Sequence, residues 1–379
     1  MSSPSSPPDA GHDYRPDRTE LNDPIYVDVD GAQAGTLPAT RVHLPDDDFV
    51  RGDARLGRTE AGCVCICLGR KLHLSDDGGQ TWQTRDLPVA SGGFGVVGAD
   101  SLVVFTADPT PSTLRSTDLG RTWSEPIPLD IGAFDKAGGW THIMQVPEGP
   151  ALMTVQCYNE DRATDPRTGA KRRSTQLGLY DHVYRSSDSG RSWHDRTGIA
   201  RDSAETSLLW LRSGRMMAAI RVQRVPQRVL PSDDVEQFKA LGLWNRGDGM
   251  PFIKHAFLAD SDDLGRTWTN LRLAPCDRIG PDQVAESLCP SELIQLPDGR
   301  VLWIHHRRHQ PRKGVYARVS HDDGRTWTGR RYWLRNLRDQ RHGVYPASTL
   351  LDDGTILTVT SANHGNRAMA IRWKLPPGD

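Results

Sequence analysis

The sequence has no long apolar run. No stretch approaches the roughly 20 residues that a helix needs to cross a bilayer, which excludes a helical membrane protein. The first residues, Met1 to Pro8, lack the basic and apolar regions of a secretory signal peptide. If Met1 is the natural start, we expect a cytoplasmic location and no membrane partner.

Net charge is also almost absent. The 379 residues include 47 Lys and Arg against 48 Asp and Glu, which gives a formal charge of −1 at pH 7. No global field therefore draws the chain to nucleic acid, and we expect no nucleic-acid partner. The composition carries no signal for an oligomeric state.

Cysteine is scarce, with six in the chain, and no Cys or His pair has the spacing of a zinc site. The three histidines between residues 305 and 309 do not change this, because consecutive residues of a strand face opposite sides. We expect no metal, no cofactor, and reduced buried thiols. Cys63, Cys65 and Cys67 alternate along an apolar run and should share one face of a strand.

What the sequence does contain is one eight-residue pattern, repeated five times. The pattern is Ser-x-Asp-x-Gly-x-(Thr/Ser)-Trp, and it starts at Ser75, Ser116, Ser186, Ser261 and Ser320. The Asp side chain accepts hydrogen bonds from its own turn, and the Gly takes a positive φ without strain. The Trp buries apolar area while its indole N–H seeks a partner. The pattern predicts tight β-hairpins in a repeat architecture, and it marks turns rather than chemistry.

A second repeat, out of phase with the first, is an apolar–turn–apolar hairpin with a glycine at position 149, 214, 299 or 354. Weaker copies lie at residues 51–68 and 92–105. The two repeats predict an all-β fold, a six-bladed β-propeller with four-stranded antiparallel blades. The expected blades are residues 41–88, 89–134, 138–200, 202–275, 287–338 and 343–375.

The ends and insertions of the chain give further expectations. Residues 1–24 are rich in Pro, Ser and Asp and should be disordered or loosely attached, which leaves 25–379 as a single propeller domain. The segment Ile25–Val29 is available to close the ring. A long insertion between residues 222 and 253, with a short helix predicted at 232–242, indicates a binding site on one rim.

The repeat itself locates a candidate site. The first strand of each propeller blade lines the axis, so equivalent first residues reach one common rim. Counting nine residues back from each hairpin glycine gives Trp140, Glu205, Pro290 and Tyr345. Sixteen residues further on, at the expected ends of the second strands, lie Gln156, Arg221, His306 and Ser361.

On these turns and spacings the chain resembles the sialidase (neuraminidase) superfamily. Its members share a six-bladed propeller with the same repeated turns, which are called Asp boxes. The resemblance covers about residues 41–375. It implies an axial site with three Arg that clamp a sugar carboxylate, a Tyr nucleophile, a Glu that acts as its base, and an Asp acid/base.

Carried over by position, the resemblance makes Tyr345 the nucleophile, Glu205 its base and Arg221 the second arginine. Arg312, with Arg308 as a close rival, is similar in placement to the third. Arg51 stands where the first is expected, although the family's Ile-Pro is absent after it, and Arg55 and Arg58 stay open. The other residues expected in the substrate site are His306, Trp140 and Gln156.

The acid/base is the departure from the family. The segment between Cys67 and Ser75 leaves only a tight hairpin, with no Asp where the family has its acid. Asp108, in the equivalent loop of the second blade, is the first substitute to consider. His306, His142 and Glu160 follow.

These residues predict an exo-acting glycoside hydrolase that removes a terminal sialic acid or related 2-keto acid sugar, with a carboxylate-bearing small molecule or glycan as its partner. Guanidinium groups bind carboxylates in a bidentate manner, and an anionic substrate favours a neutral Tyr nucleophile. Two alternatives stay open. One is a propeller glycosidase or lyase on uronic-acid glycans with a His base, and the other is a non-catalytic propeller that binds acidic glycans.

Overall fold

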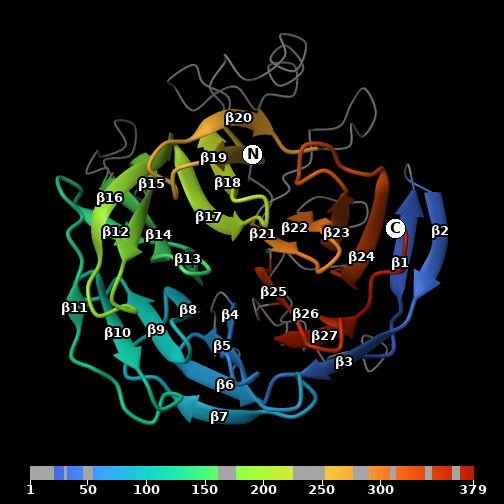
Figure 1. Ribbon diagram of the computed structural model, residues 1–379, viewed down its shortest axis with the longest axis horizontal. Coiled ribbons are helices and arrows are strands. Elements are labelled where there is room, and N and C mark those ends of the chain that lie inside the picture. The colour runs from blue at the N-terminus through green and yellow to red at the C-terminus, as the bar shows by residue number, and fades with distance from the viewer. Residues whose placement is uncertain are drawn as a thin grey trace, which may run out of the picture.

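The structure is a computed structural model that describes residues 21–29, 32–45, 54–160, 176–224, 252–275, 290–307, 313–337, 344–360 and 368–379. In these ranges the regular elements are β-strands arranged around one axis (Figure 1), so the fold is all-β and propeller-like. No helix long and apolar enough to cross a membrane occurs in this part of the chain. The helix expected at residues 232–242 lies outside the described residues.

The strands form groups, each of which runs outwards from the centre of the ring. The inner strand of each group lines that centre in Figure 1. These inner strands are β4 (Arg55–Arg58), β8 (Gly93–Val97), β13 (Thr141–Gln145), β17 (Ser203–Trp210), β21 (Ser291–Gln295) and β25 (Pro346–Leu350). Each inner strand packs against the next one, and β25 packs against β4. The inner strands therefore form a closed circle, and their equivalent ends face the same rim.

Further strands pair outwards from the inner ones, antiparallel to each other. The second strands are β5 (Val64–Leu68), β9 (Ser101–Thr106), β14 (Ala151–Glu160), β18 (Met216–Arg224), β22 (Val301–Arg307) and β26 (Ile356–Thr360). The third strands are β6 (Lys71–Ser75), β10 (Ser112–Ser116), β15 (Gln176–Ser186), β19 (Phe252–Ser261), β23 (Gly314–Ser320) and β27 (Met369–Trp373). The outermost strands are β7 (Gln83–Asp86), β11 (Ile127–Pro128), β16 (His194–Arg201), β20 (Thr269–Leu273), β24 (Arg330–Asn336) and β3 (Ala39–His43). A short strand, β12 (Lys136–Gly138), pairs with β14.

Hydrogen bonding joins these strands into five sheets, of four, four, four, six and nine strands, instead of separate four-stranded blades throughout. The nine-stranded sheet arises because the inner strands β8 and β13 pair with each other in parallel. Glycines make this approach sterically feasible. A Cβ on Gly93 would lie 2.3 Å from the Cβ of Thr141, and one on Gly95 would lie 2.4 Å from the carbonyl oxygen of Ile143.

The ring closes differently from the expectation for Ile25–Val29. The strand that completes the last group is β3, which pairs with β27 over its whole length. Strand β1 (Ile25–Val29) instead pairs with the outer edge of β24 and forms a hairpin with β2 (Ala32–Leu37), which makes the six-stranded sheet. A segment from near the start of the chain thus lies beside its last strand (Figure 1).

The first described residues are also attached to this edge. Leu21 packs against a hydrophobic cluster that includes Ile25 and Trp373, and the carbonyl of Asp23 accepts a 2.8 Å hydrogen bond from Arg41 Nε. Of the segment 1–24 that was expected to be loose, residues 21–24 are therefore in contact with the sheet. The rest of it lies outside the described residues.

The hydrophobic core lies between neighbouring groups of strands. The expected face of Cys63, Cys65 and Cys67 is confirmed, since all three are buried in one cluster with Leu72 and Phe94 from β6 and β8. These cysteines and Cys157 are buried free thiols, as expected. Cys276 and Cys289 lie outside the described residues.

The five Asp boxes have the predicted hydrogen bonds. In each box the Ser hydroxyl accepts from the Gly amide four residues on, at 2.7–2.9 Å. The Asp carboxylate accepts from the amide of the Thr or Ser four residues on, at 2.8–2.9 Å, and from its hydroxyl, at 2.6–2.7 Å. The five indole N–H groups were expected to find partners, but none does so among the described residues.

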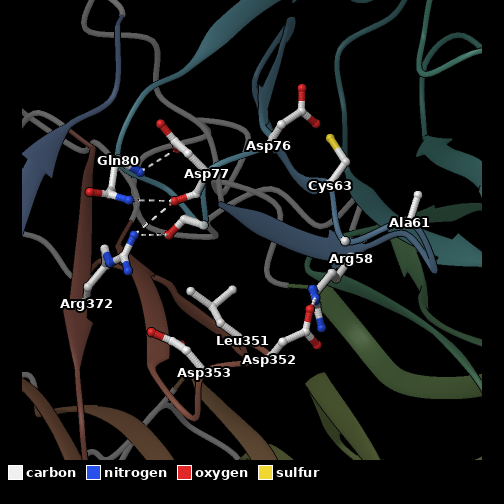
Figure 2. A pocket seen from close by; sticks show the side chains of 12 residues that line it. Arg58, Ala61, Cys63, Asp76, Asp77, Gln80, Leu351, Asp352, Asp353 and Arg372 are labelled. Carbon is white, nitrogen blue, oxygen red and sulfur yellow. Dashed lines mark hydrogen bonds and ion pairs between the residues drawn. The ribbon is translucent and has the colours of Figure 1, made fainter.

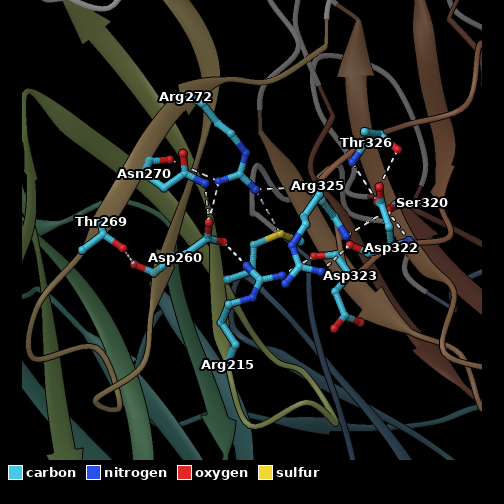
Figure 3. A network of polar contacts seen from close by, with 12 residues as sticks. Arg215, Asp260, Thr269, Asn270, Arg272, Ser320, Asp322, Asp323, Arg325 and Thr326 are labelled. Carbon is cyan, nitrogen blue, oxygen red and sulfur yellow. Dashed lines mark hydrogen bonds and ion pairs between the residues drawn. The ribbon is translucent and has the colours of Figure 1, made fainter.

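Each Asp box is also bonded to the preceding group of strands. The residue between the Asp and the Gly of every box has a positive φ. Its carbonyl accepts a hydrogen bond from an arginine of the preceding group. In the fifth box the carbonyl of the Gly also accepts a hydrogen bond, from a second arginine. The arginines are Arg372, Arg85, Arg115, Arg185, Arg215 and Arg272. Figure 3 shows the fifth case, in which Arg215 and Arg272 share the Asp260 carboxylate as they reach the box. The bond from Arg372 to the first box spans the closure of the ring.

Candidate functional site

Glu205, Arg221 and Tyr345 meet at one oxygen atom. The Tyr345 hydroxyl donates a 2.8 Å hydrogen bond to Glu205 Oε1, and Arg221 Nη1 donates to the same oxygen at 2.5 Å. Glu205 and Arg221 are more than nine-tenths buried, with 6% and 7% of their surfaces exposed. The residues come from β17, β18 and the position just before β25, so two groups of strands contribute, separated by the group of β21.

The backbone of β17 aims Glu205 at this point. The pairing of β17 with β18 shifts register between Ala204 and Ser207, which is a β-bulge. Glu205 lies inside the bulge with a φ of +50°. Bulges redirect side chains and are frequent next to active sites, and a positive φ in a residue other than glycine is a strained conformation that the surroundings must hold.

A second polar cluster lies deeper along the axis. Arg55, His142 and Glu292 each stand seven residues before a hairpin glycine, at positions 62, 149 and 299, so they lie at one level of three inner strands. His142 Nε2 is 3.5 Å from Glu292 Oε1, and the Arg55 charge acts on both groups. All three are largely buried.

Arg55 is held by the backbone and by an aromatic ring. Its Nε donates to the carbonyl of Thr141 at 2.9 Å and its Nη1 to the carbonyl of Ala54 at 2.6 Å. Its guanidinium carbon lies 4.1 Å from the centre of the Trp140 ring, in a cation–π contact. Trp140 in turn stacks on His142 at 6.1 Å between ring centres.

The protonation of this deeper cluster follows from its burial. His142 Nδ1 accepts a 3.1 Å hydrogen bond from the amide of Leu208, so the neutral ring carries its proton on Nε2, towards Glu292. Burial, together with the Arg55 charge, lowers the pKa of His142 to about 3. Burial raises the pKa of Glu292 to about 8, although Arg55 opposes the shift. At neutral pH the pair is therefore a neutral imidazole beside a protonated carboxylic acid.

The other predicted site residues are buried, exposed or outside the described residues. Gln156 and His306 are buried. His306 lies at the end of β22, as expected, and its amide donates to the carbonyl of Pro290 at 3.1 Å. Gln156 lies in the middle of β14, because that strand continues beyond its expected end. Asp108 is exposed at the turn between β9 and β10, and in the described chain its carboxylate makes no hydrogen bond or ion pair. Arg51, Arg308, Arg312 and Ser361 lie outside the described residues, and so does the side chain of Glu160.

Two acidic groups near the axis were missed from the sequence. Glu292 could have been found by applying the repeat count two residues further along each inner strand, where it aligns with His142. Asp181, on β15, is buried behind Glu205. Burial raises the pKa of Asp181 to about 7, although hydrogen bonds from Thr206 and the charge of Arg221 oppose the shift. It carries no sequence signal, because its place depends on the contact of β15 with β17.

A cavity of about 390 Å³ opens at the other end of the inner strands, between the first Asp box and the turn after β25 (Figure 2). Arg58 pairs there with Asp352, and Arg372 donates to the carbonyls of Asp77 and Gly78. Since these arginines are already bonded to protein groups, the cavity lacks the arrangement expected for a carboxylate clamp. Across the described ranges no group of three or more His, Cys, Asp or Glu residues is placed to hold a metal ion.

Comparisons with known proteins agree with this fold. Residues 99–359 match the BNR repeat-like domain family, and residues 73–84 match the BNR/Asp-box repeat. A sialidase of Bacteroides fragilis (strain YCH46) is 22% identical over 338 residues, which cover 75% of this chain and 52% of that protein. The chain thus spans about half the length of this relative.

Three solved structures show the same fold. A protein of unknown function from Dyadobacter fermentans DSM 18053 has a TM-score of 0.60 and 17% identity, covering 89% of this chain and 98% of that one. The Hadza microbial sialidase Hz136 has a TM-score of 0.57 and 18% identity, covering 91% and 71%. The Penicillium chrysogenum α-L-arabinanase has a TM-score of 0.58 and 11% identity, covering 89% and 98%. Because the family match takes in most of the sequence, the chain belongs to the BNR repeat-like family, among the sialidase-like Asp-box propellers.

Proposed function

We propose that the chain is an exo-acting glycoside hydrolase of the sialidase type, with Tyr345 as nucleophile and Glu205 as its base. The observation that carries the proposal is the shared Glu205 Oε1, which accepts from both the Tyr345 hydroxyl and Arg221. The similarity to the Bacteroides fragilis sialidase and to the fold of a second sialidase supports the same reaction class.

We infer that the five sheets correspond to six blades. The nine-stranded sheet contains two of them, joined through β8 and β13, and the six-stranded sheet contains one blade extended by β1 and β2. With this count, Glu205 and Arg221 belong to the fourth blade and Tyr345 to the start of the sixth.

The first chemical step follows from the hydrogen bonds. The Tyr345 oxygen forms a bond to the anomeric carbon as the glycosidic C–O bond breaks, and the phenolic proton passes to Glu205 Oε1, 2.8 Å away. A general acid gives a proton to the departing oxygen, and water later hydrolyses the tyrosyl–sugar bond. A Tyr nucleophile is the known sialidase exception among glycosidases.

Arg221 has two roles in this scheme. It is ion-paired with Glu205 and so fixes the position of that carboxylate, and we propose that its guanidinium also binds the substrate carboxylate. Arg51 and Arg312, with Arg308 as the rival to Arg312, are proposed to complete the clamp. Asp108 remains the proposed acid/base, with the substrate-site roles of His306, Trp140 and Gln156 as further proposals.

One observation favours a second candidate, a glycosidase that acts on a sugar without a carboxylate. Glycosidases commonly use one carboxylic acid and one carboxylate, and Glu292 is a carboxylic acid at neutral pH while Glu205 is ion-paired as a carboxylate. The uronate alternative has less support, because His142 has its pKa lowered to about 3 and is a weak base.

The test compares turnover of fluorogenic sialosides, uronides and α-L-arabinosides by the wild type and by Tyr345→Phe. We expect sialoside turnover that falls by a factor of about 10³ or more in Tyr345→Phe, since the variant lacks a nucleophile. Tyr184→Phe is the matched control, because it also removes a buried hydroxyl hydrogen bond, 2.8 Å to the carbonyl of Asp130, away from the site. Turnover of arabinosides alone, or sialoside turnover unaffected by Tyr345→Phe, would overturn the proposal, and binding of sialic acid without turnover would favour the non-catalytic alternative.

A further inference from the structure

We propose that Asp181 is a positioning residue that holds the Glu205 carboxylate against Tyr345 and Arg221. The inference rests on the proposed role of Glu205 as the base. Asp181 belongs to β15 and does not touch the Tyr345–Glu205–Arg221 contacts directly, so its effect passes through the backbone of β17.

The segment that Asp181 contacts is the bulge that contains Glu205. Ser203 and Ala204 pair with β18 on one side of the bulge and Ser207 on the other, while Glu205 and Thr206 have no partner in that pairing. Thr206 must therefore place its backbone N–H and C=O elsewhere, because buried backbone polar groups are costly when unsatisfied. Thr206 is fully buried.

Side chains from the neighbouring group of strands take over these bonds. Asp181 Oδ2 accepts from the Thr206 amide at 3.1 Å and from the Thr206 hydroxyl at 2.5 Å. The Thr154 hydroxyl donates to the Thr206 carbonyl at 2.9 Å. The amide of Asp181 donates to the Ser203 hydroxyl at 2.8 Å, which fixes the start of the same bulge.

These bonds explain how the strained conformation of Glu205 persists. A positive φ outside glycine is unfavourable and is kept only where the surroundings determine it. Asp181 anchors Thr206, the residue immediately after Glu205. The peptide that joins Glu205 to Thr206 therefore cannot rotate towards an ordinary strand conformation without losing both bonds from Thr206 to Asp181. The direction of the Glu205 side chain is set by that peptide.

The charges around Asp181 are consistent with a supporting role. The groups that act on it are Glu205 on β17, Arg221 on β18 and Thr206, and Asp181 in turn acts on Cys157 of β14. The negative charge of Glu205 acts with burial to raise the pKa of Asp181, which is consistent with the two side chains lying close together. The backbone bonds carry the inference.

The experiment compares Asp181→Ala and Asp181→Asn by crystal structure and by steady-state kinetics on the substrate that the wild type turns over. Asn presents an oxygen to the Thr206 amide and hydroxyl, so we expect Asp181→Asn to keep the Glu205 conformation and a kcat within a few-fold of wild type. Asp181→Ala removes both bonds. We expect Glu205 to leave its positive φ, the Tyr345–Glu205 bond to break, and kcat to fall about 100-fold with little change in KM.

Asp28→Ala is the matched control, because Asp28 is similarly buried and pairs with Arg331 at 3.0 Å between β1 and β24, away from the site. It should lower the melting temperature and leave kcat and the Glu205 conformation unchanged. If Asp181→Ala does not fold, Thr206→Val, with Thr206→Ser as its control, removes only the hydroxyl bond and is expected to move Glu205 in the same direction.

The structures decide the inference independently of the reaction. Displacement of Glu205 in Asp181→Ala and not in Asp181→Asn supports it, even if no glycoside is turned over and the proposed function fails. Glu205 in its wild-type conformation in Asp181→Ala, or in Thr206→Val where that variant is needed, overturns it, whether or not the wild type is a sialidase.

Discussion

The hydroxyl of Tyr345 and the carboxylate of Glu205 are 2.8 Å apart although 140 residues separate them in the chain. The two residues occupy equivalent places in two hairpin repeats, nine residues before Gly354 and Gly214. A repeat fold brings such places to one rim, so the proposed base and the proposed nucleophile can meet without a dedicated loop. Arg221 completes the arrangement from the strand that pairs with β17.

If Glu205 is the base, Glu205→Gln should lower kcat strongly while preserving most of the contacts. The amide oxygen can still accept from Tyr345 and Arg221, but it cannot take the phenolic proton, so we expect kcat to fall by a factor of about 10²–10⁴. The measurement is kcat on a sialoside with a fluorescent leaving group, with a melting curve to confirm folding.

The double variant Glu205→Gln/Tyr345→Phe sharpens this test. Residues that act as one unit give effects that do not add, so the double variant should be no slower than the slower single variant. Losses that multiply across the two changes would show that Glu205 acts on some group other than Tyr345.

The elements that sequence reasoning located are those fixed by local chemistry. An Asp box needs only its own Ser, Asp, Gly and Thr or Ser, whose hydrogen bonds recur in all five copies, so the turns and the strands beside them follow from a short pattern. Counting from hairpin glycines then located Glu205, Arg221 and Tyr345, because inner strands of equal register begin at one rim.

What sequence reasoning missed depends on contacts between groups of strands. Both Ile25–Val29 and Ala39–His43 can form strands, and only the open edge of β27 decides that β3 closes the ring. Asp181 and Thr154 have no local signal, since they act by bonding to a bulge on β17. The fusion of two groups through β8 and β13 depends on glycines whose small size matters only once the strands meet.

Glu292 should make the stability of the fold depend on pH. Burial raises its pKa from the ordinary 4.5 to about 8, so the folded chain holds a proton that the unfolded chain releases. The stabilising contribution of this group is therefore complete below about pH 4.5 and is lost as the pH rises towards 8. We expect the loss to be on the order of 5 kcal/mol, and Glu292→Gln, which cannot ionise, to be free of it.

The pKa shift of His142 has the opposite effect on the pH dependence of stability, and the Glu292→Gln variant separates the two contributions. The pKa of His142 is lowered from 6.5 to about 3, so its contribution is complete above pH 6.5 and is lost as the pH falls towards 3. Denaturant unfolding of wild type and Glu292→Gln between pH 4.5 and 8.5 isolates Glu292 as the difference between two curves. A difference that does not change with pH would contradict the shifted pKa.

The close approach of β8 and β13 predicts the effect of a single methyl group. In Gly95→Ala the new Cβ would lie 2.4 Å from the carbonyl oxygen of Ile143 and 2.6 Å from its Cβ, so the two inner strands must separate. Overpacking of this kind costs about 1–3 kcal/mol, and we expect a loss of that size in the free energy of unfolding, measured with urea. Gly35→Ala is the control, because no atom lies within 4 Å of its new Cβ and its stability should stay within about 0.5 kcal/mol of wild type. Equal stabilities of the two variants would mean that the parallel pairing of β8 with β13 does not constrain the ring, and the separation between these strands would then have to be larger in solution.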